Sequence, residues 1–250
     1  MRANRLREIW AAGKPATNFW LGVPSMLSAE IVAHQGWDSL TVDMQHGHIG
    51  FESMVAMLTA ISSTASVPLV RVPWNQPGDV MRALDAGSYG VICPNIDTRE
   101  QCERFVGACR YAPQGYRSVG PKRAVLYGGS DYIARANETV LAIVQVESAL
   151  GLKNVAEIAS VKGLDMIYIG PTDLTLSLGR DIRVGLADPV LMKAIDEILA
   201  SAKAAGIRAG IYCRNADDAK AMFAKGFDLA TVTSDDALLS AGAAVAAKFR

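Results

Sequence analysis

The sequence predicts a (β/α)8 barrel, also called a TIM barrel, on two observations. The chain has 250 residues, half of them apolar, which matches the usual size of such a barrel with one large core. Short apolar runs rich in β-branched residues alternate with helical patterns along the chain. No change in composition marks a linker, so we expect a single domain over residues 1–250. A doubly wound sheet is the alternative, but no GxGxxG motif follows the first predicted strand and no Walker-type loop occurs.

Eight short apolar segments predict the strands, because parallel strands that are buried on both faces are continuously apolar. In order they are residues 18–23, 39–43, 67–72, 90–93, 141–146, 166–169, 208–212 and 229–232. The helices predicted around them are residues 4–12, 26–35, 51–62, 77–87, 98–110, 131–137, one between the fifth and sixth strands, one after residue 173, and residues 189–205, 216–225 and 234–249. Gly13 and Gly36 end the first two helices, Pro77 opens the fourth, and Ser234 caps the last.

Residues 112–130 interrupt this alternation. The segment contains two prolines and four glycines, which predicts a long loop on the face where the strands end. Loops of this length within a compact domain are usually functional.

Charge and composition exclude several classes of protein. The chain has 25 basic and 25 acidic residues and no long run of like charge, which argues against binding to nucleic acid or to an anionic membrane surface. The basic N-terminus lacks the apolar core of a signal peptide, and no apolar run is long enough to cross a bilayer, so we expect a cytoplasmic protein. The four cysteines have no CxxC spacing and are expected to be reduced, mostly buried thiols.

Two carboxylates follow adjacent predicted strands. Glu147 comes directly after the fifth strand and Asp173 shortly after the sixth, and parallel strands end at the same rim of a barrel. Two carboxylates brought together at such a rim repel each other unless a cation lies between them, and a hard divalent cation is the usual partner. The alternative is that each carboxylate only caps the helix that follows it.

Other polar and aromatic residues are predicted at the same rim. They are residues 20–22, Asp43, Gln45, His46, His48, Arg71, Pro94, Asn95, Gln145, Gly170, Pro171, Thr172, Tyr212 and Thr233. His46 is suited to transfer protons near neutral pH, although a structural hydrogen bond with Asp43 is an alternative. Arg71 lies on a central strand and needs an anionic partner, which is Glu147 or a substrate carboxylate. No lysine falls in a predicted strand, which argues against a Schiff-base mechanism and favours carbonyl chemistry at a metal.

Seven motifs in unbroken order resemble the HpcH/HpaI family of class II, metal-dependent pyruvate aldolases, which act on 4-hydroxy-2-oxo acids. They are FWLG (19–22), DMQHG (43–47), VRVPWN (70–75), LDAG (84–87), RYAPQGYRSVG (110–120), VQVES (144–148) and GPTDL (170–174). The likeness runs from about Trp20 to the C-terminus. Each motif is weak alone, and the set is specific.

The resemblance implies roles for individual residues. Glu147 and Asp173 would be the metal ligands, with water and the 2-oxo acid completing an octahedral shell. The catalytic residues that it implies are Arg71, which contacts the keto oxygen, and His46, which moves protons with support from Asp43 and from Asp85 of a neighbouring subunit. The substrate-binding residues that we expect are Gln145, Gly170, Pro171, Thr172, Trp20 and Tyr212, the last two on the aldehyde side. Relatives form homohexamers built from two trimers, in which the last helix packs on a neighbouring subunit.

The expected function is a reversible aldol reaction. A 4-hydroxy-2-oxo acid is cleaved to pyruvate or hydroxypyruvate and an aldehyde through an enolate stabilised by Mg²⁺, Mn²⁺ or Co²⁺. A citrate lyase β-like or malyl-CoA-type lyase is an alternative, in which the basic residues Arg117, Lys122 and Arg123 would bind the phosphates of CoA. We interpret Arg117 and Arg123 instead as residues that shape the aldehyde end of the pocket. A third possibility is a non-enzymatic sensor that binds a metal and a 2-oxo acid.

Overall fold

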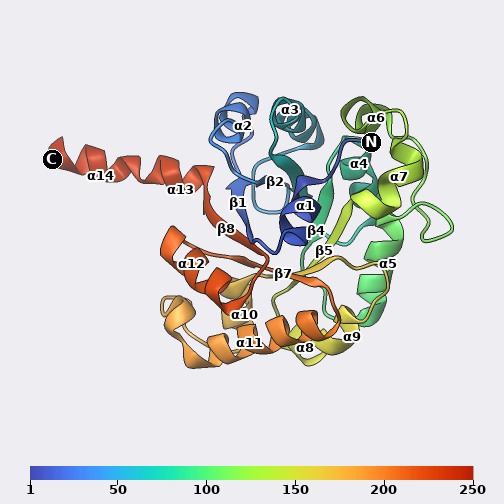
Figure 1. Cartoon of the computed structure of the whole chain (residues 1–250). Helices are drawn as coiled ribbons and strands as arrows, with labels where there is room; N and C mark the ends of the chain where they lie inside the picture. The colour runs from blue at the N-terminus through green and yellow to red at the C-terminus, as the bar shows by residue number, and fades with distance from the viewer. Residues whose placement is uncertain (250) are drawn as a thin grey trace.

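Eight parallel strands close into a barrel in a computed structural model that describes residues 1–249 (Figure 1). Arg250, the last residue of the predicted domain, lies outside the described residues. The strands are β1 Ala16–Leu21, β2 Ser39–Asp43, β3 Val67–Arg71, β4 Gly90–Cys93, β5 Leu141–Val146, β6 Met166–Ile169, β7 Arg208–Tyr212 and β8 Leu229–Ser234. Each strand pairs with the next along the chain, and β8 closes the barrel on β1. The predicted (β/α)8 fold is confirmed.

Helices surround the barrel and return the chain from the end of one strand to the start of the next (Figure 1). They are α1 Arg5–Ala11, α2 Met26–Ala33, α3 Phe51–Ile61, α4 Pro77–Asp85, α5 Arg99–Cys109, α6 Lys122–Gly128, α7 Tyr132–Thr139, α8 Ala149–Lys153, α9 Val155–Ala159, α10 Pro171–Ser177, α11 Pro189–Ala204, α12 Ala216–Lys225, α13 Asp235–Ser240 and α14 Gly242–Ala246. Two short 3-10 segments, Gly185–Ala187 and Ala247–Phe249, complete the set. Side-chain caps start several helices, among them Ser25 before α2 and Thr98 before α5.

A polar network crosses the interior of the barrel. The Asn18 side chain on β1 donates hydrogen bonds to Ser39 and Thr41 on β2, at 2.9 and 3.0 Å, and accepts one from Thr231 on β8 at 2.9 Å. The hydroxyl groups of Thr231 and Tyr168 are 2.6 Å apart, so the network also includes β6. All five side chains are fully buried and partnered, which lets the core tolerate them.

The segment 112–130 differs from its prediction. It contains the helix α6, and it follows α5, which has already carried the chain back from the rim where strands end. Its neighbours confirm that it lies at the opposite end of the barrel. The backbone N–H of Arg2 donates to Gly128, and the ring of Tyr127 packs at 4.7 Å from that of Tyr89, directly before β4. The prediction of a long loop on the strand-end face was therefore wrong.

The C-terminal region also differs from its prediction. Instead of one helix over residues 234–249, the structure has α13, α14 and a 3-10 turn, and β8 extends to Ser234. Figure 1 shows this arm extending away from the barrel. Its apolar side chains Leu238, Leu239, Val245 and Phe249 are exposed. Within residues 1–249, no helix is both long enough and apolar enough to span a membrane.

The interior network gives a first prediction, for Asn18→Ala. The change leaves Ser39 and Thr41 without their donor in a fully buried site, which should lower the free energy of unfolding by about 2 kcal/mol. Urea denaturation followed by tryptophan fluorescence measures this loss. The exposed Gln114, whose side chain makes no hydrogen bond within residues 1–249, is the control, and Gln114→Ala should leave the stability unchanged. Equal stability of both variants would contradict a stabilising role of the network.

Candidate active site

A cavity of about 360 Å³ opens at the carboxyl ends of the strands. Most residues that the sequence predicts for the site line it. They are Trp20, Asp43, His46, Arg71, Gln145, Gly170, Pro171, Thr172, Asp173 and Tyr212. Glu147 lies next to this lining, buried at 3 % exposure and bonded to the Gln145 side chain. The order of parallel strands therefore brings these residues together as predicted. We call this cavity of about 360 Å³ the donor cavity.

Asp43 and Arg71 form a buried pair across adjacent strands. They end β2 and β3 in direct register, and Arg71 donates from Nε and Nη2 to the two carboxylate oxygens at 2.9 and 2.7 Å. Burial would raise the pKa of Asp43, but the hydrogen bonds and charge of Arg71 lower it below its usual value. The guanidinium also stacks 4.8 Å from the centre of the Trp20 ring. Within residues 1–249, Nη1 of Arg71 has no hydrogen-bond acceptor, so it is available to a ligand in the donor cavity.

Glu147 carries the strongest electrostatic perturbation among the predicted site residues. Its carboxylate accepts hydrogen bonds from the backbone N–H of Asn95 at 3.0 Å and from Nε2 of Gln145 at 2.6 Å. Burial and the negative charge of Asp173 nevertheless raise the pKa of Glu147 to about 7. Asn95 has a positive φ of 53°, a backbone conformation that is uncommon outside glycine and that occurs here at a functional site. The site therefore has an excess of negative charge that a cation would compensate.

The residues around Glu147 fit a hard divalent cation. The Oε1 atom of Gln145 is buried without a hydrogen-bond partner, next to the Glu147 carboxylate. Asp173, in the first turn of α10, is exposed and lines the cavity. Carboxylate and amide oxygens are the ligands that Mg²⁺ and Mn²⁺ prefer. No group of three or more His, Cys, Asp or Glu side chains suited to a metal occurs in residues 1–249, so water or substrate would supply the remaining ligands.

Gly170 makes this arrangement possible. It lies between β6 and α10, and a Cβ atom at this position would overlap Oε2 of Glu147 and lie 2.6 Å from Nε2 of Gln145. Only glycine leaves room there for the paired carboxylate and amide.

His46 lies in the loop between β2 and α3 with an exposed side chain. Its backbone N–H donates to Asp43 at 3.3 Å, and the N–H of Gln45 donates to the same oxygen at 3.0 Å. Within residues 1–249, no hydrogen bond joins the imidazole to Asp43. Asp43 therefore positions the loop that carries His46, while the ring stays free to reach a ligand in the donor cavity.

Asp85, Arg117 and Arg123 lie outside the donor cavity of their own chain. Asp85 ends α4 and accepts a hydrogen bond from Arg117 at 2.8 Å. Arg117 is buried between the rings of Tyr111 and Tyr132, at 4.4 and 5.5 Å from their centres. Arg123 donates to the carbonyl of residue 86 at 2.6 Å and lines a separate cavity of about 280 Å³ together with Asp85. A single chain thus does not bring these three residues to the site.

Two residues of the donor cavity were missed in the sequence. Tyr168 was interpreted only as part of an apolar strand, although its ring stacks 5.8 Å from Trp20. Asp236 falls within the last predicted helix, residues 234–249, and was not predicted to lie at the rim. Its position two residues after the end of β8 was the available signal, since residues after strand ends line the pocket of a barrel.

The fold and this cavity define the class of protein, a TIM-barrel enzyme with an acidic site suited to a hard cation. Residues 17–241 match the sequence model of the HpcH/HpaI aldolase/citrate lyase family, and the chain therefore belongs to this family. The expected family is confirmed.

Named relatives agree with this assignment. The chain is 42% identical over 240 residues to a hydroxypyruvate/pyruvate aldolase from Rhizorhabdus wittichii, covering 96% of both chains. It is 35% identical over 242 residues to a 5-keto-4-deoxy-D-glucarate aldolase from Salmonella arizonae, covering 96% of this chain and 93% of that one. A crystal structure of an HpcH/HpaI aldolase/citrate lyase family protein from Burkholderia cenocepacia superposes with a TM-score of 0.89 at 34% identity, covering 98% of both chains. The chain is therefore an enzyme of the aldolase class, a carbon–carbon lyase.

The raised pKa of Glu147 gives a second prediction, for Glu147→Gln in chelator-treated protein. The folded chain holds the Glu147 proton up to about pH 7, whereas the unfolded chain releases it near its usual pKa of 4.5. The stability that this difference contributes is complete below pH 4.5 and is lost as the pH rises through about 7. The wild type should therefore lose about 3 kcal/mol between pH 4.5 and 8 that Glu147→Gln retains.

Thermal and urea unfolding at pH 4.5, 6 and 8 measures this difference. Glu157→Gln, at an exposed position on α9, is the control and should follow the pH profile of the wild type. Parallel pH profiles for Glu147→Gln and the wild type would show that Glu147 titrates normally.

Proposed function

We propose that this enzyme is a divalent-metal-dependent class II aldolase that reversibly joins pyruvate or hydroxypyruvate to an aldehyde. The observation that carries the proposal is the buried Glu147 carboxylate, with a raised pKa, beside the unpartnered Oε1 of Gln145 and close enough to Arg71 to feel its charge. The names of the relatives support the choice of 2-oxo acid, because hydroxypyruvate and pyruvate appear in the name of a protein that is 42% identical to this chain.

Glu147 and Asp173 would hold the cation, with Gln145 next to them. When bound, a cation such as Mg²⁺, Mn²⁺ or Co²⁺ supplies positive charge that withdraws electrons from the ketone of the 2-oxo acid. The family membership of the chain supports this cofactor, and so does the set of oxygen donors at the site.

Arg71 and the start of α10 would orient the 2-oxo acid. The free Nη1 of Arg71 would donate a hydrogen bond to the keto oxygen, where negative charge develops as the enolate forms. Gly170, Pro171 and Thr172 line the same cavity, and first-turn backbone N–H groups such as that of Thr172 have no acceptor within the helix. These groups suit the substrate carboxylate. Trp20 and Tyr212, whose rings are 5.7 Å apart, would face the aldehyde.

His46 would move the proton. In the synthetic direction it takes a proton from the carbon next to the ketone, and the resulting enolate carbon attacks the carbonyl carbon of the aldehyde. The new alkoxide then receives a proton from the imidazolium, so His46 returns to its starting state. Cleavage follows the reverse path. Asp43 assists by fixing both Arg71 and the backbone of the His46 loop.

The chain would act as a homo-oligomer, in agreement with the predicted hexamer of two trimers. The exposed apolar side chains of the C-terminal arm, such as Leu239 and Phe249, suit burial against another copy. The catalytic role of Asp85 also needs a neighbouring copy, since Asp85 does not line the donor cavity of its own chain. The four cysteines, all buried and free, support a reducing compartment such as the cytoplasm.

A lyase that acts on CoA thioesters is the weaker alternative. The phosphates of CoA need accessible basic residues, but Arg117 is buried at 3 % exposure against Asp85. Arg123 donates to Thr59, Ser62 and a backbone carbonyl, so its guanidinium is already occupied. Neither residue lines the donor cavity.

The third prediction tests the function through His46→Gln. With Mg²⁺ or Mn²⁺ present, the wild type should cleave a 4-hydroxy-2-oxo acid and exchange the methyl protons of pyruvate into heavy water. Loss of the general base should slow both reactions by about 10²-fold. Proton NMR follows the exchange, and a coupled pyruvate assay follows the cleavage.

His48→Gln is the matched control, because His48 is also exposed and lies two residues away but does not line the donor cavity. It should keep nearly the wild-type rates. The proposal fails if chelator-treated wild type keeps full activity, or if His46→Gln exchanges protons as fast as His48→Gln.

The fourth prediction concerns Gly170→Ala and metal binding. The added methyl group would overlap the Glu147 carboxylate and displace it, so the affinity for Mn²⁺ should fall by about 10-fold or more. Gly78→Ala, on α4, is the control, since a Cβ there meets nothing within 4 Å. Calorimetric titration of the metal-free proteins measures both affinities. Equal Mn²⁺ affinity in the two variants would contradict the assignment of Glu147 as a ligand.

A further inference from the structure

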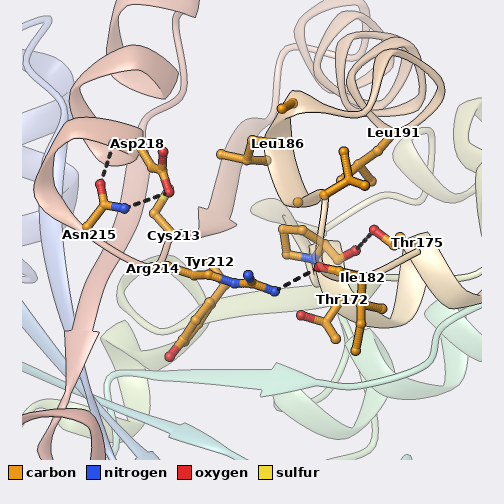
Figure 2. Close-up of a pocket in the computed structure, with 14 residues that line it drawn as sticks. Thr172, Thr175, Ile182, Leu186, Leu191, Tyr212, Cys213, Arg214, Asn215 and Asp218 are labelled. Carbon is orange, nitrogen blue, oxygen red and sulfur yellow. Dashed lines mark hydrogen bonds between the residues drawn. The ribbon is translucent and has the colours of Figure 1, made fainter. Parts of the chain in front are cut away.

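A second cavity of about 320 Å³ adjoins the donor cavity (Figure 2). It lies between the segment 182–187, which connects α10 to α11, and the residues that follow β7. Both cavities are lined by Pro171, Thr172 and Tyr212, so they meet along these three residues. Its volume is within the range of small-molecule sites, which begins at about 300 Å³.

One wall of this second cavity is apolar. Ile182, Val184, Leu186 and Leu191 contribute it, and Figure 2 shows Leu186, Leu191 and Ile182 around the space. Ile182 and Val184 are large apolar residues that remain 36 and 47 % exposed. Exposed apolar side chains that line one hollow favour an apolar ligand, since its binding removes their surface from water.

Several polar side chains of the cavity are already paired. Thr175 donates to the carbonyl of Pro171 at 2.6 Å, and Asn215 donates to Asp218 at 3.0 Å. Arg214 reaches across to the carbonyl of Ile182 at 3.2 Å, as the dashed line in Figure 2 shows. These pairs occupy part of the polar lining, whereas the apolar wall offers a ligand contact that needs no hydrogen bond.

Tyr212 forms the boundary between the two cavities. Its side chain lines both cavities, and burial and the charge of Asp236, a residue of the donor cavity, raise the pKa of Tyr212. Its ring meets Trp20 edge-on at 5.7 Å. An aldehyde whose carbonyl carbon lies beside the 2-oxo acid would therefore extend its far end past Tyr212 and Thr172 into the second cavity.

We propose that the second cavity is the subsite for the tail of the aldehyde acceptor and that it takes an unbranched aliphatic chain. This inference rests on the proposed aldolase function. The donor cavity performs the chemistry, and the apolar wall of residues 182–191 selects acceptors by the length of their chain.

The first test is a series of aldehydes from acetaldehyde to hexanal, each with pyruvate and Mg²⁺. The wild-type kcat/KM should rise with chain length by up to about fourfold for each added CH₂ group until the cavity is full. Exchange of pyruvate methyl protons, measured without any aldehyde, reports separately on the donor cavity. Absence of exchange in the wild type would overturn the aldolase function itself, whereas exchange with a flat chain-length profile would overturn only the subsite.

The second test fills or enlarges the cavity at Leu186. Leu186→Trp should lower the ratio of kcat/KM for hexanal to that for acetaldehyde by about tenfold or more, because the indole occupies the space for the tail. Leu176→Trp is the matched control, at an exposed leucine of α10 that lines neither cavity, and its ratio should stay near that of the wild type. Leu186→Ala should shift the preferred acceptor to a longer or branched aldehyde.

An unchanged ratio in Leu186→Trp, or an equal loss for all aldehydes with pyruvate exchange intact, would overturn the subsite. If Leu186→Trp also loses pyruvate exchange, the donor cavity is damaged in this variant, and the test then depends on Leu186→Ala. An unchanged acceptor preference in Leu186→Ala overturns the proposal.

Discussion

The burial of Glu147 is the constraint on which the rest of the site depends. A carboxylate removed from water needs compensation, and the neighbouring charge of Asp173 increases that need. The backbone of Asn95, the amide of Gln145 and the charge of Arg71 each favour the ionised form, yet together they leave its pKa above the usual value. The exclusion of a side chain at Gly170 keeps this crowded arrangement possible. A hard cation would compensate the remaining negative charge of Glu147 and Asp173, which is why the proposed chemistry centres on Glu147.

Asp43 links the end of a neighbouring strand to the loop that carries His46. Its two oxygens accept hydrogen bonds from Nε and Nη2 of Arg71 on the adjacent strand, which fixes the direction of the guanidinium and leaves Nη1 free for a ligand. One of the same oxygens accepts from the backbone of the loop that carries His46. The donor cavity is thus built on strand ends, whereas the second cavity uses loops. Barrel enzymes vary such loops to change their substrates while the strands keep the catalytic geometry.

Much of this protein follows from local sequence patterns. Eight apolar runs separated by helical patterns specify the barrel, because each strand can be buried only between helices on one side and the barrel interior on the other. Parallel strands in sequence order then place the residues after each run at one rim. This reasoning brought Arg71, Gln145, Gly170 and Asp173 to one cavity without knowledge of any distance. It failed for residues 112–130, because a turn-rich segment has the same composition at either end of the barrel, and only the direction of α5 decides its place.

The sequence alone thus determined the fold and the rim on which the polar residues meet, since both depend on the periodicity and order of strands. Only the tertiary structure decided which groups touch. Closure of the barrel brings Asp235 back to accept hydrogen bonds from the backbone of Gly22 and Val23, more than 200 residues away, and so brings Asp236 to the donor cavity. The pairing of Asp43 with Arg71 rather than with the imidazole of His46 is likewise a matter of distances across strands, which no local pattern encodes.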